Sequence, residues 1–128
     1  MSVPEVMVVE DDHDIRETLR EIIEGQGCRV RCAANGREAL DLLTSETTLP
    51  SLLLVDLMMP VMDGRSFRRA QLEDPRLATI PVVIVTAFRD SLGDVDDLEP
   101  LTMLRKPIQL KELVRVIRAH CTDAPDAS

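Results

Sequence analysis

The sequence predicts an α/β fold, a doubly wound parallel sheet with helices on both faces. Apolar runs of strand length alternate with segments of helical periodicity along the whole chain, which is typical of this fold class. In addition, several of the apolar runs end on polar residues of different chemical kinds. Because open parallel sheets bind their ligands at the carboxyl ends of the strands, the fold prediction also indicates where a site should lie.

The first strand, helix and second strand each have a distinct sequence signal. Residues 5–10 are expected to form a strand, whose continuously apolar stretch over residues 6–9 is typical of a central strand covered on both faces. The spacing of Asp14 and Glu17 resembles a capping box that begins a helix, and Gly25 ends that helix. Residues 29–33 alternate between polar and apolar side chains, so this strand is expected at an edge of the sheet.

The same order continues through the middle of the chain. Asn35 begins a second helix with an apolar face, and a third strand then runs up to Asp56. A third helix is expected over residues 65–73. A fourth strand over residues 82–86 follows, because this segment is again continuously apolar up to its last residue.

Residues 88–100 give the weakest signal of the chain. Ser91 can cap a short fourth helix there, but Gly93 and Pro100 oppose helix formation in so short a segment. After a fifth strand, the last helix is expected over residues 109–120, which carry apolar residues on one helical face.

Length and composition fit one globular domain. The chain has 128 residues, of which 45% are hydrophobic and 30% charged. The net charge of −8 argues against a direct nucleic-acid partner, and no apolar run approaches the roughly 20 residues of a membrane helix. We expect the domain to span residues 4–121, followed by a short polar tail over residues 122–128.

The cysteine pattern and the N-terminus indicate the cellular compartment. The three cysteines are odd in number and form no C-x-x-C pair, so neither a disulfide framework nor a zinc site is predicted. The N-terminal residues lack the charged and apolar regions of a signal peptide. The chain is therefore expected to be a cytoplasmic protein without a membrane partner.

Polar side chains stand at the ends of four of the predicted strands. They are Glu10, Asp11, Asp56, Thr86 and Lys106. In a parallel sheet these positions meet at one edge, so three carboxylates, a hydroxyl and an ammonium are expected in one pocket. Each residue alone is ordinary, because an acid at the end of a strand is usually a solvated cap. Their joint order along the chain is the signal.

This set of side chains suits a divalent cation and a phosphoryl group. Three adjacent carboxylates repel one another by about 3 kcal/mol per pair at ~5 Å and an effective dielectric of ~20. Mg²⁺ removes that cost and takes carboxylate, water and phosphate oxygens together. Lys106 can neutralise a phosphoryl oxygen, and Thr86 can donate its hydroxyl. Asp56, oriented by a strand but open at the sheet edge, is placed as a nucleophile would be.

Four motifs in this order resemble the receiver domain of two-component response regulators. They are Val8-Val9-Glu10-Asp11-Asp12, Asp56-Leu57-Met58-Met59-Pro60-x-Met62-Asp63-Gly64, Ile84-Val85-Thr86-Ala87 and Lys106-Pro107. The resemblance covers about residues 4–120. It implies a flavodoxin-like, five-stranded parallel sheet of order 2-1-3-4-5 that is flanked by five helices.

The same resemblance implies a role for each matching residue. Asp56 would be the phosphoacceptor. Mg²⁺ would be held by Glu10 through a water and directly by Asp11, Asp56 and the Met58 carbonyl. The phosphoryl group would be contacted by Thr86, the Ala87 amide and Lys106. The protein would catalyse only its own aspartyl phosphorylation and dephosphorylation, with a sensor histidine kinase or a phosphotransfer protein as the donor.

Two departures from the family pattern concern the output of the domain. The aromatic residue that is usual three positions before the lysine is Met103 here, and the usual small pair before the fifth strand is Glu99-Pro100. The phosphorylation chemistry is untouched by these changes, but an aromatic-rotamer readout is not available. We expect an unidentified downstream protein to bind the face built from residues 88–118.

Three rival functions remain to be weighed. A phosphatase of the haloacid-dehalogenase type would need a second aspartate two residues after its nucleophile, where this chain has Met58. A nucleotide-binding protein would need a glycine-rich phosphate loop, and neither G-x-x-x-x-G-K-[ST] nor G-x-G-x-x-G occurs. A pseudo-receiver that acts without phosphorylation loses an acid or the lysine, whereas this chain keeps Asp56 and Lys106.

Overall fold

The computed structural model describes residues 3–45, 48–86 and 96–121, which contain a five-stranded parallel sheet of order β2-β1-β3-β4-β5. The strands are β1 (Glu5–Val9), β2 (Arg29–Ala33), β3 (Leu52–Asp56), β4 (Val82–Thr86) and β5 (Thr102–Arg105). The helices are α1 (His13–Glu24), α2 (Gly36–Ser45), α3 (Gly64–Glu73) and α5 (Leu110–Cys121), with a short 3₁₀ helix, η1 (Asp96–Leu98). The α/β class and the strand order are as predicted.

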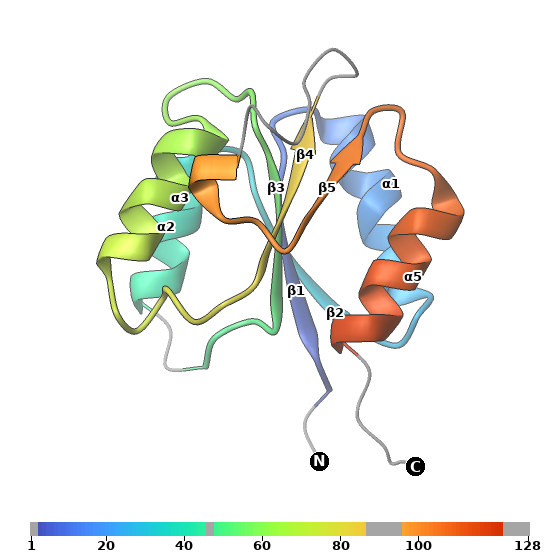
Figure 1. Cartoon of the computed structure of the whole chain (residues 1–128). Coiled ribbons are helices and arrows are strands. Elements are labelled where there is room, and N and C mark those ends of the chain that lie inside the picture. Colours follow the sequence, from blue (N-terminus) through green and yellow to red (C-terminus); the bar gives the residue numbers. More distant parts are fainter. Residues whose placement is uncertain (1–2, 46–47, 87–95, 122–128) are drawn as a thin grey trace.

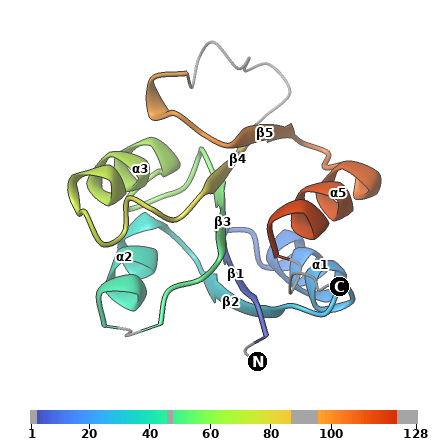
Figure 2. The same cartoon turned by 60° about the horizontal axis from the view of Figure 1, so that its bottom comes forward.

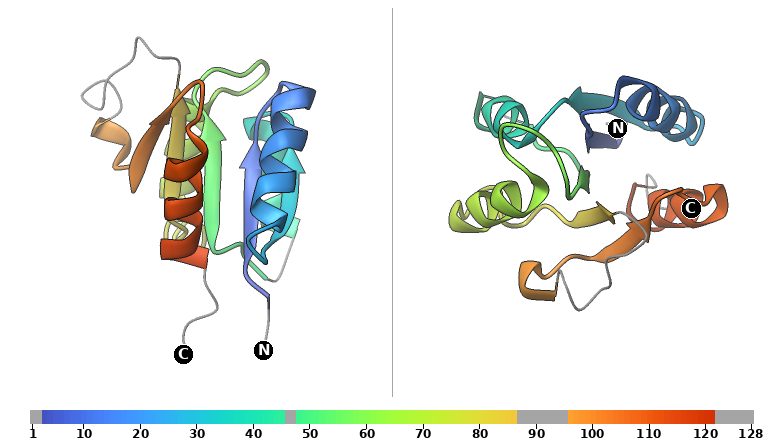
Figure 3. Two further views of the ribbon diagram at one scale, coloured as in Figure 1. Left: turned by 90° about the vertical axis from the view of Figure 1, so that its right-hand side faces the viewer. Right: turned by 90° about the horizontal axis from the view of Figure 1, so that it is seen from above.

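The helices form two layers around the sheet. Helices α1 and α5 cover one face, and α2 and α3 cover the other (Figures 1 and 2). Seen from the side in Figure 3, α1 and α5 run next to each other along the sheet. The 3₁₀ helix η1 lies beside α3, on the opposite face from α5 (Figure 1). No helix within the described ranges is long and apolar enough to cross a bilayer.

The fifth helix that the sequence analysis expected is not seen in the described part of the chain, which holds four α-helices and η1. The short helix weighed over residues 88–100 falls mostly on residues 87–95, which lie outside the described residues. Residues 96–98 of that segment form the 3₁₀ helix instead of an α-helix.

Alternate residues along the strands supply two separate cores. Leu53 and Val55 of β3 pack with Phe67 on the α2–α3 side, whereas Leu52 and Leu54 face the α1–α5 side. All five residues of β3 and all five of β4 are buried, which explains their continuous apolar runs. Strand β2 is an edge strand with half-exposed residues, as its alternating sequence predicted.

The ends of the first two helices test the capping predictions. The capping box expected at Asp14 is wrong: Asp12 caps α1, and its side chain accepts a hydrogen bond of 3.0 Å from the Ile15 amide. Asp14 lies inside the first turn, where its charge still favours the helix N-terminus. Asn35 does cap α2, since its side chain accepts a hydrogen bond of 2.9 Å from the Glu38 amide.

Candidate functional site

Three carboxylates meet at the carboxyl ends of β1 and β3, as predicted. Glu10, Asp11 and Asp56 each offer an oxygen, and these oxygens lie within 4.8 Å of one another. We call these residues the acidic cluster. Glu10 and Asp56 are only 2% and 4% exposed, whereas Asp11 is exposed to solvent. The cluster therefore has two desolvated carboxylates and one that opens to the surface.

The turn between β1 and α1 fixes Glu10. Its amide continues the sheet by donating to the Ala33 carbonyl over 3.0 Å. The Asp12 amide donates to Glu10 Oε2 over 3.1 Å, and Arg16 Nη1 donates to the Glu10 carbonyl oxygen over 2.8 Å. Both the main chain and the side chain of Glu10 are thus held by hydrogen bonds within the protein.

Asp56 is held at the end of the central strand β3. The Met58 amide points at Asp56 Oδ1 over 3.3 Å, and the Leu57 amide donates to the Val85 carbonyl over 2.8 Å. The N-terminus of α3 packs directly against this loop, because a Cβ atom at Gly64 would lie 2.4 Å from the Asp56 carbonyl oxygen. Only glycine therefore fits at position 64 in this arrangement.

Lys106 enters the same pocket from the end of β5. Its Nζ lies 3.0 Å from Asp56 Oδ2 and 3.1 Å from Glu10 Oε1. Its amide donates to the Thr86 carbonyl over 2.8 Å, which extends the pairing of β4 with β5. The Lys106–Pro107 peptide bond that follows is cis. The ammonium thus bridges the two buried carboxylates.

One ammonium does not balance the negative charge of the acidic cluster. Burial raises the pKa of Glu10 to about 7; the Asp12 amide opposes this shift and the charge of Asp56 adds to it. Burial works against the charged form of Lys106, but the hydrogen bonds and the charges of Asp56 and Glu10 together outweigh it and raise the pKa of Lys106. Cation binding would relieve this excess of negative charge, so the donor set fits a hard divalent cation.

The other predicted site residues lie around this cluster. Thr86 is fully buried at the end of β4. Met58 lies in the loop next to Asp56 and is 69% exposed. Ala87 falls outside the described residues. Met103 lies half-buried in β5 opposite Ile84 and packs against the α2–α3 core.

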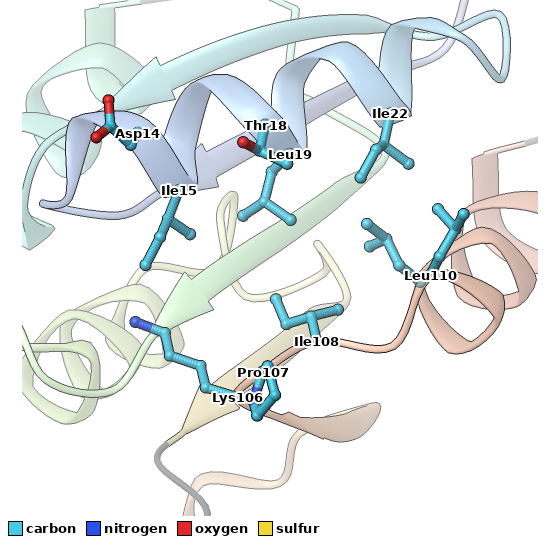
Figure 4. Close-up of a pocket in the computed structure, with 10 residues that line it drawn as sticks. Asp14, Ile15, Thr18, Leu19, Ile22, Lys106, Pro107, Ile108 and Leu110 are labelled. Carbon is cyan, nitrogen blue, oxygen red and sulfur yellow. The ribbon is translucent and has the colours of Figure 1, made fainter.

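An apolar groove of about 650 Å³ adjoins Lys106 and was not predicted. It lies between α1 and the segment that joins β5 to α5, and Ile15, Leu19 and Ile22 of α1 point toward that segment in Figure 4. Its apolar lining consists of Ile15, Leu19, Ile22, Pro107, Ile108, Leu110 and Leu113. Leu110 is 58% exposed, so part of this lining faces solvent.

Sequence reasoning also missed residues that hold the site in place. The sequence gives no signal for Arg16, because a cation in an amphipathic helix usually stays in solvent. In the structure its side chain instead donates to the main-chain carbonyl of Glu10. The sequence does contain a signal for the groove, because Ile15, Leu19 and Ile22 share one helical face, a pattern that also predicts a buried core. Of these three residues only Leu19 is buried, and the other two are partly exposed.

Comparison with known proteins points to the same family as the motifs of the site. The family model described as "Response regulator receiver domain" matches residues 6–118. The chain is 32% identical to Sporulation initiation phosphotransferase F of Bacillus subtilis, over 90% of this chain and 91% of that protein. It is 37% identical to Response regulator MprA of Mycolicibacterium vanbaalenii, over 89% of this chain but 48% of that protein. The chain thus spans about half the length of some relatives and nearly all of others.

Solved structures share the fold. The crystal structure of a putative response regulator from Chloroflexus aurantiacus matches with a TM-score of 0.84 and 28% identity, over 92% of this chain and 97% of the other.

Proposed function

Because the chain belongs to the family of response regulator receiver domains, we propose that it accepts a phosphoryl group on Asp56 and thereby switches its protein contacts in a phosphorelay. Phosphorylation of an aspartate is typical of this family. The observation that carries the proposal is the contact of Lys106 Nζ with both Asp56 and Glu10, inside a cluster of three carboxylate residues.

In this proposal Asp56 is the nucleophile. One of its carboxylate oxygens forms the bond to phosphorus while the bond between phosphorus and the donor imidazole breaks. The strand end and the neighbouring Met58 amide hold the carboxylate in a fixed orientation. Lys106 pairs with the incoming oxygens, and Thr86 and the Ala87 amide complete the contacts to the phosphoryl group.

Mg²⁺ is the proposed cofactor. When bound, it offsets the charge that accumulates as a phosphoryl group approaches the carboxylates. The residues that would hold it are Glu10, Asp11, Asp56 and the Met58 carbonyl. The excess of negative charge and the raised pKa of Glu10 support this proposal, because they indicate that the metal-free cluster is electrostatically unfavourable.

The proposed phosphodonor is a sensor histidine kinase or a phosphotransfer protein. The apolar groove next to Lys106 supports a protein donor, since a small phosphodonor would have no use for exposed Leu110 and half-exposed Ile15 and Ile108. A downstream protein is proposed to bind the face built from residues 88–118, of which residues 96–118 are described.

We further propose that the receiver domain spans residues 4–121, with residues 122–128 as a tail, and that it works in the cytoplasm. The support for this location is the cysteine pattern of the sequence, which predicts no disulfide framework. In this proposal the domain turns over no external substrate beyond its own phosphorylation and dephosphorylation.

A labelling experiment tests the proposal. The protein is incubated with phosphoramidate, with Mg²⁺ or with EDTA, and the modified residue is mapped by mass spectrometry. We expect label on Asp56 that needs the metal and disappears in Asp56→Asn. Asp12→Asn is the matched control, because it removes a neighbouring exposed charge and keeps a side chain that can cap α1.

Two outcomes would contradict this function. Label on another residue, or full labelling in EDTA, would refute the assignment of Asp56 and the metal site. Absence of label from phosphoramidate, acetyl phosphate and a panel of histidine kinases would favour the pseudo-receiver instead.

A further inference from the structure

Helix α3 buries two polar side chains that the proposed phosphorylation chemistry does not use. Arg68 is 5% exposed and Gln71 is fully buried, on a helix with few apolar residues. A buried arginine is costly unless its donors are satisfied. Such a residue calls for a structural or functional explanation.

Arg68 is satisfied by the chain that enters β5. Its Nε donates to the Leu98 carbonyl over 2.8 Å, and its Nη2 donates to the Glu99 carbonyl over 2.9 Å. Its Nη1 donates to Gln71 Oε1 over 2.8 Å. Gln71 Nε2 in turn donates to the carbonyls of Leu77 and Ile80 over 2.8 and 3.0 Å. Helix α3 therefore holds both the entry to β5 and the approach to β4.

Other arginines of α3 hold the same segment from outside. Arg65 and Arg69 both bond the exposed carboxylate of Asp97, at 3.1 and 3.2 Å. Leu98 is fully buried in the core that contains Phe67. Figure 2 shows η1 lying next to α3 at the outer side of the sheet. Three consecutive residues, 97–99, are thus fixed by three arginines of one helix.

The N-terminus of the same helix is fixed to the acidic cluster. Gly64 begins α3 against the carbonyl of Asp56, and its amide donates to the Leu57 carbonyl over 3.0 Å. Asp63 caps the helix by accepting a hydrogen bond of 2.8 Å from the Ser66 amide. A change in the loop after Asp56 therefore acts directly on α3.

We propose that α3 is a conformational relay, which transmits a shift of the loop after Asp56 to the entry of β5 through the hydrogen bonds of Arg68. Helices are stiff, so a shift at Gly64 moves Arg68, and the two carbonyls bonded to Arg68 follow it. The face built from residues 88–118 then responds through Leu98 and Glu99. This path does not need the aromatic switch residue that is usual in β5, where this chain has Met103. This inference rests on the proposed phosphorylation of Asp56 and adds the path by which it is read out.

Hydrogen exchange of residues 96–105 tests the relay. The exchange is measured with and without beryllofluoride and Mg²⁺, a mimic of the phosphoryl group, in wild type, Arg68→Leu and Arg69→Leu. We expect the mimic to change exchange in wild type and in Arg69→Leu, the matched control, because the Arg69 side chain is exposed and Arg65 still bonds Asp97 in that variant. In Arg68→Leu the change should fall by roughly 3-fold or more, within the range of mutations that alter coupling.

Labelling of Asp56 by phosphoramidate is measured in parallel. A relay residue should leave the labelling rate within about 3-fold of wild type, whereas a loss of structure would lower it together with the exchange response. If Arg68→Leu does not unfold cooperatively in urea, Arg68→Lys replaces it, because lysine keeps the charge but lacks the planar fork of donors by which Arg68 bonds both carbonyls and Gln71. An unchanged response in the Arg68 variant, or an equal loss in Arg69→Leu, would overturn the relay. Unlabelled Asp56 in wild type would refute the proposed function itself.

Discussion

Two buried polar clusters in this molecule are built in opposite ways. At the sheet end, the carboxylates of Glu10 and Asp56 share one ammonium, and burial holds the pKa of Glu10 at about 7. On α3, Arg68 and Gln71 donate to four main-chain carbonyls at 2.8–3.0 Å, and Arg68 also donates to Gln71 Oε1 over 2.8 Å. The first cluster is poised for a ligand, whereas the second is complete without one.

This difference separates a site whose charges call for a ligand from one that the protein itself satisfies, without reference to any relative. A satisfied buried network lowers the free energy of the fold, and removing a member costs stability. An unbalanced one costs stability that binding recovers, so removing a member of the excess sign should make the metal-free fold more stable. Mutations in the two clusters are therefore expected to change stability in opposite directions.

The largest effect is expected at Arg68. Arg68→Ala leaves the carbonyls of Leu98 and Glu99 and the Gln71 oxygen without a donor, so the free energy of unfolding should fall by about 3 kcal/mol. Urea melts measure it. Arg69→Ala serves as control on the same helix and should change stability by less than about 0.5 kcal/mol, because its ion pair is exposed. Equal losses in the two variants would contradict the comparison.

The opposite sign is expected at Asp56. Asp56→Asn removes one charge of the excess at nearly constant shape, so in EDTA the variant should be more stable than wild type by roughly 1–3 kcal/mol. Added Mg²⁺ should shrink the difference, because it stabilises wild type more. Urea melts with and without the metal give both values. A variant that is less stable than wild type in EDTA would mean that the Lys106 contact outweighs the repulsion.

The raised pKa of Glu10 predicts a pH dependence. A carboxyl whose folded pKa is about 7, above its ordinary 4.5, contributes stability that is present in full below the unfolded value and lost as the pH rises through the folded one. In EDTA, wild type should therefore lose on the order of 1–2 kcal/mol relative to Glu10→Gln between pH ~4.5 and ~7. The measurement is the free energy of unfolding of both proteins across this pH range. If burial did not disfavour the carboxylate, wild type would gain stability relative to Glu10→Gln as the pH rises.

The smallest effects are expected at two residues with positive φ, one in each region. Val61 lies in the loop after Asp56 with φ 66°, and Glu99 lies in the segment bonded to α3 with φ 51°. Glycine relieves the strain of this conformation but costs chain entropy, so Val61→Gly should gain roughly 1 kcal/mol and Glu99→Gly about half of that. Thermal melts resolve such differences. A loss in both variants would show that the side chains contribute more than the strain costs.

Much of the fold and the site follows from local sequence patterns. The apolar runs predicted the strands. The polar residues that follow them predicted that Glu10, Asp56 and Lys106 meet at the carboxyl ends of the strands, where the structure brings them into contact. The cap at Asn35 was readable because its partner is three residues away. The cap of α1 was predicted at Asp14 instead of Asp12 because three of the four residues 11–14 are aspartates, and the sequence does not distinguish between them.

The sequence by itself therefore determined the order of elements, the edge position of β2 and the chemistry gathered at the strand ends. Each of these depends on periodicity or on which residue ends a strand. Only the tertiary structure decided that Arg68 is buried, since its acceptors Leu98 and Glu99 lie 30 and 31 residues further along the chain. A buried arginine and a solvated one have the same local sequence, and they differ only in the carbonyls that the fold brings to them.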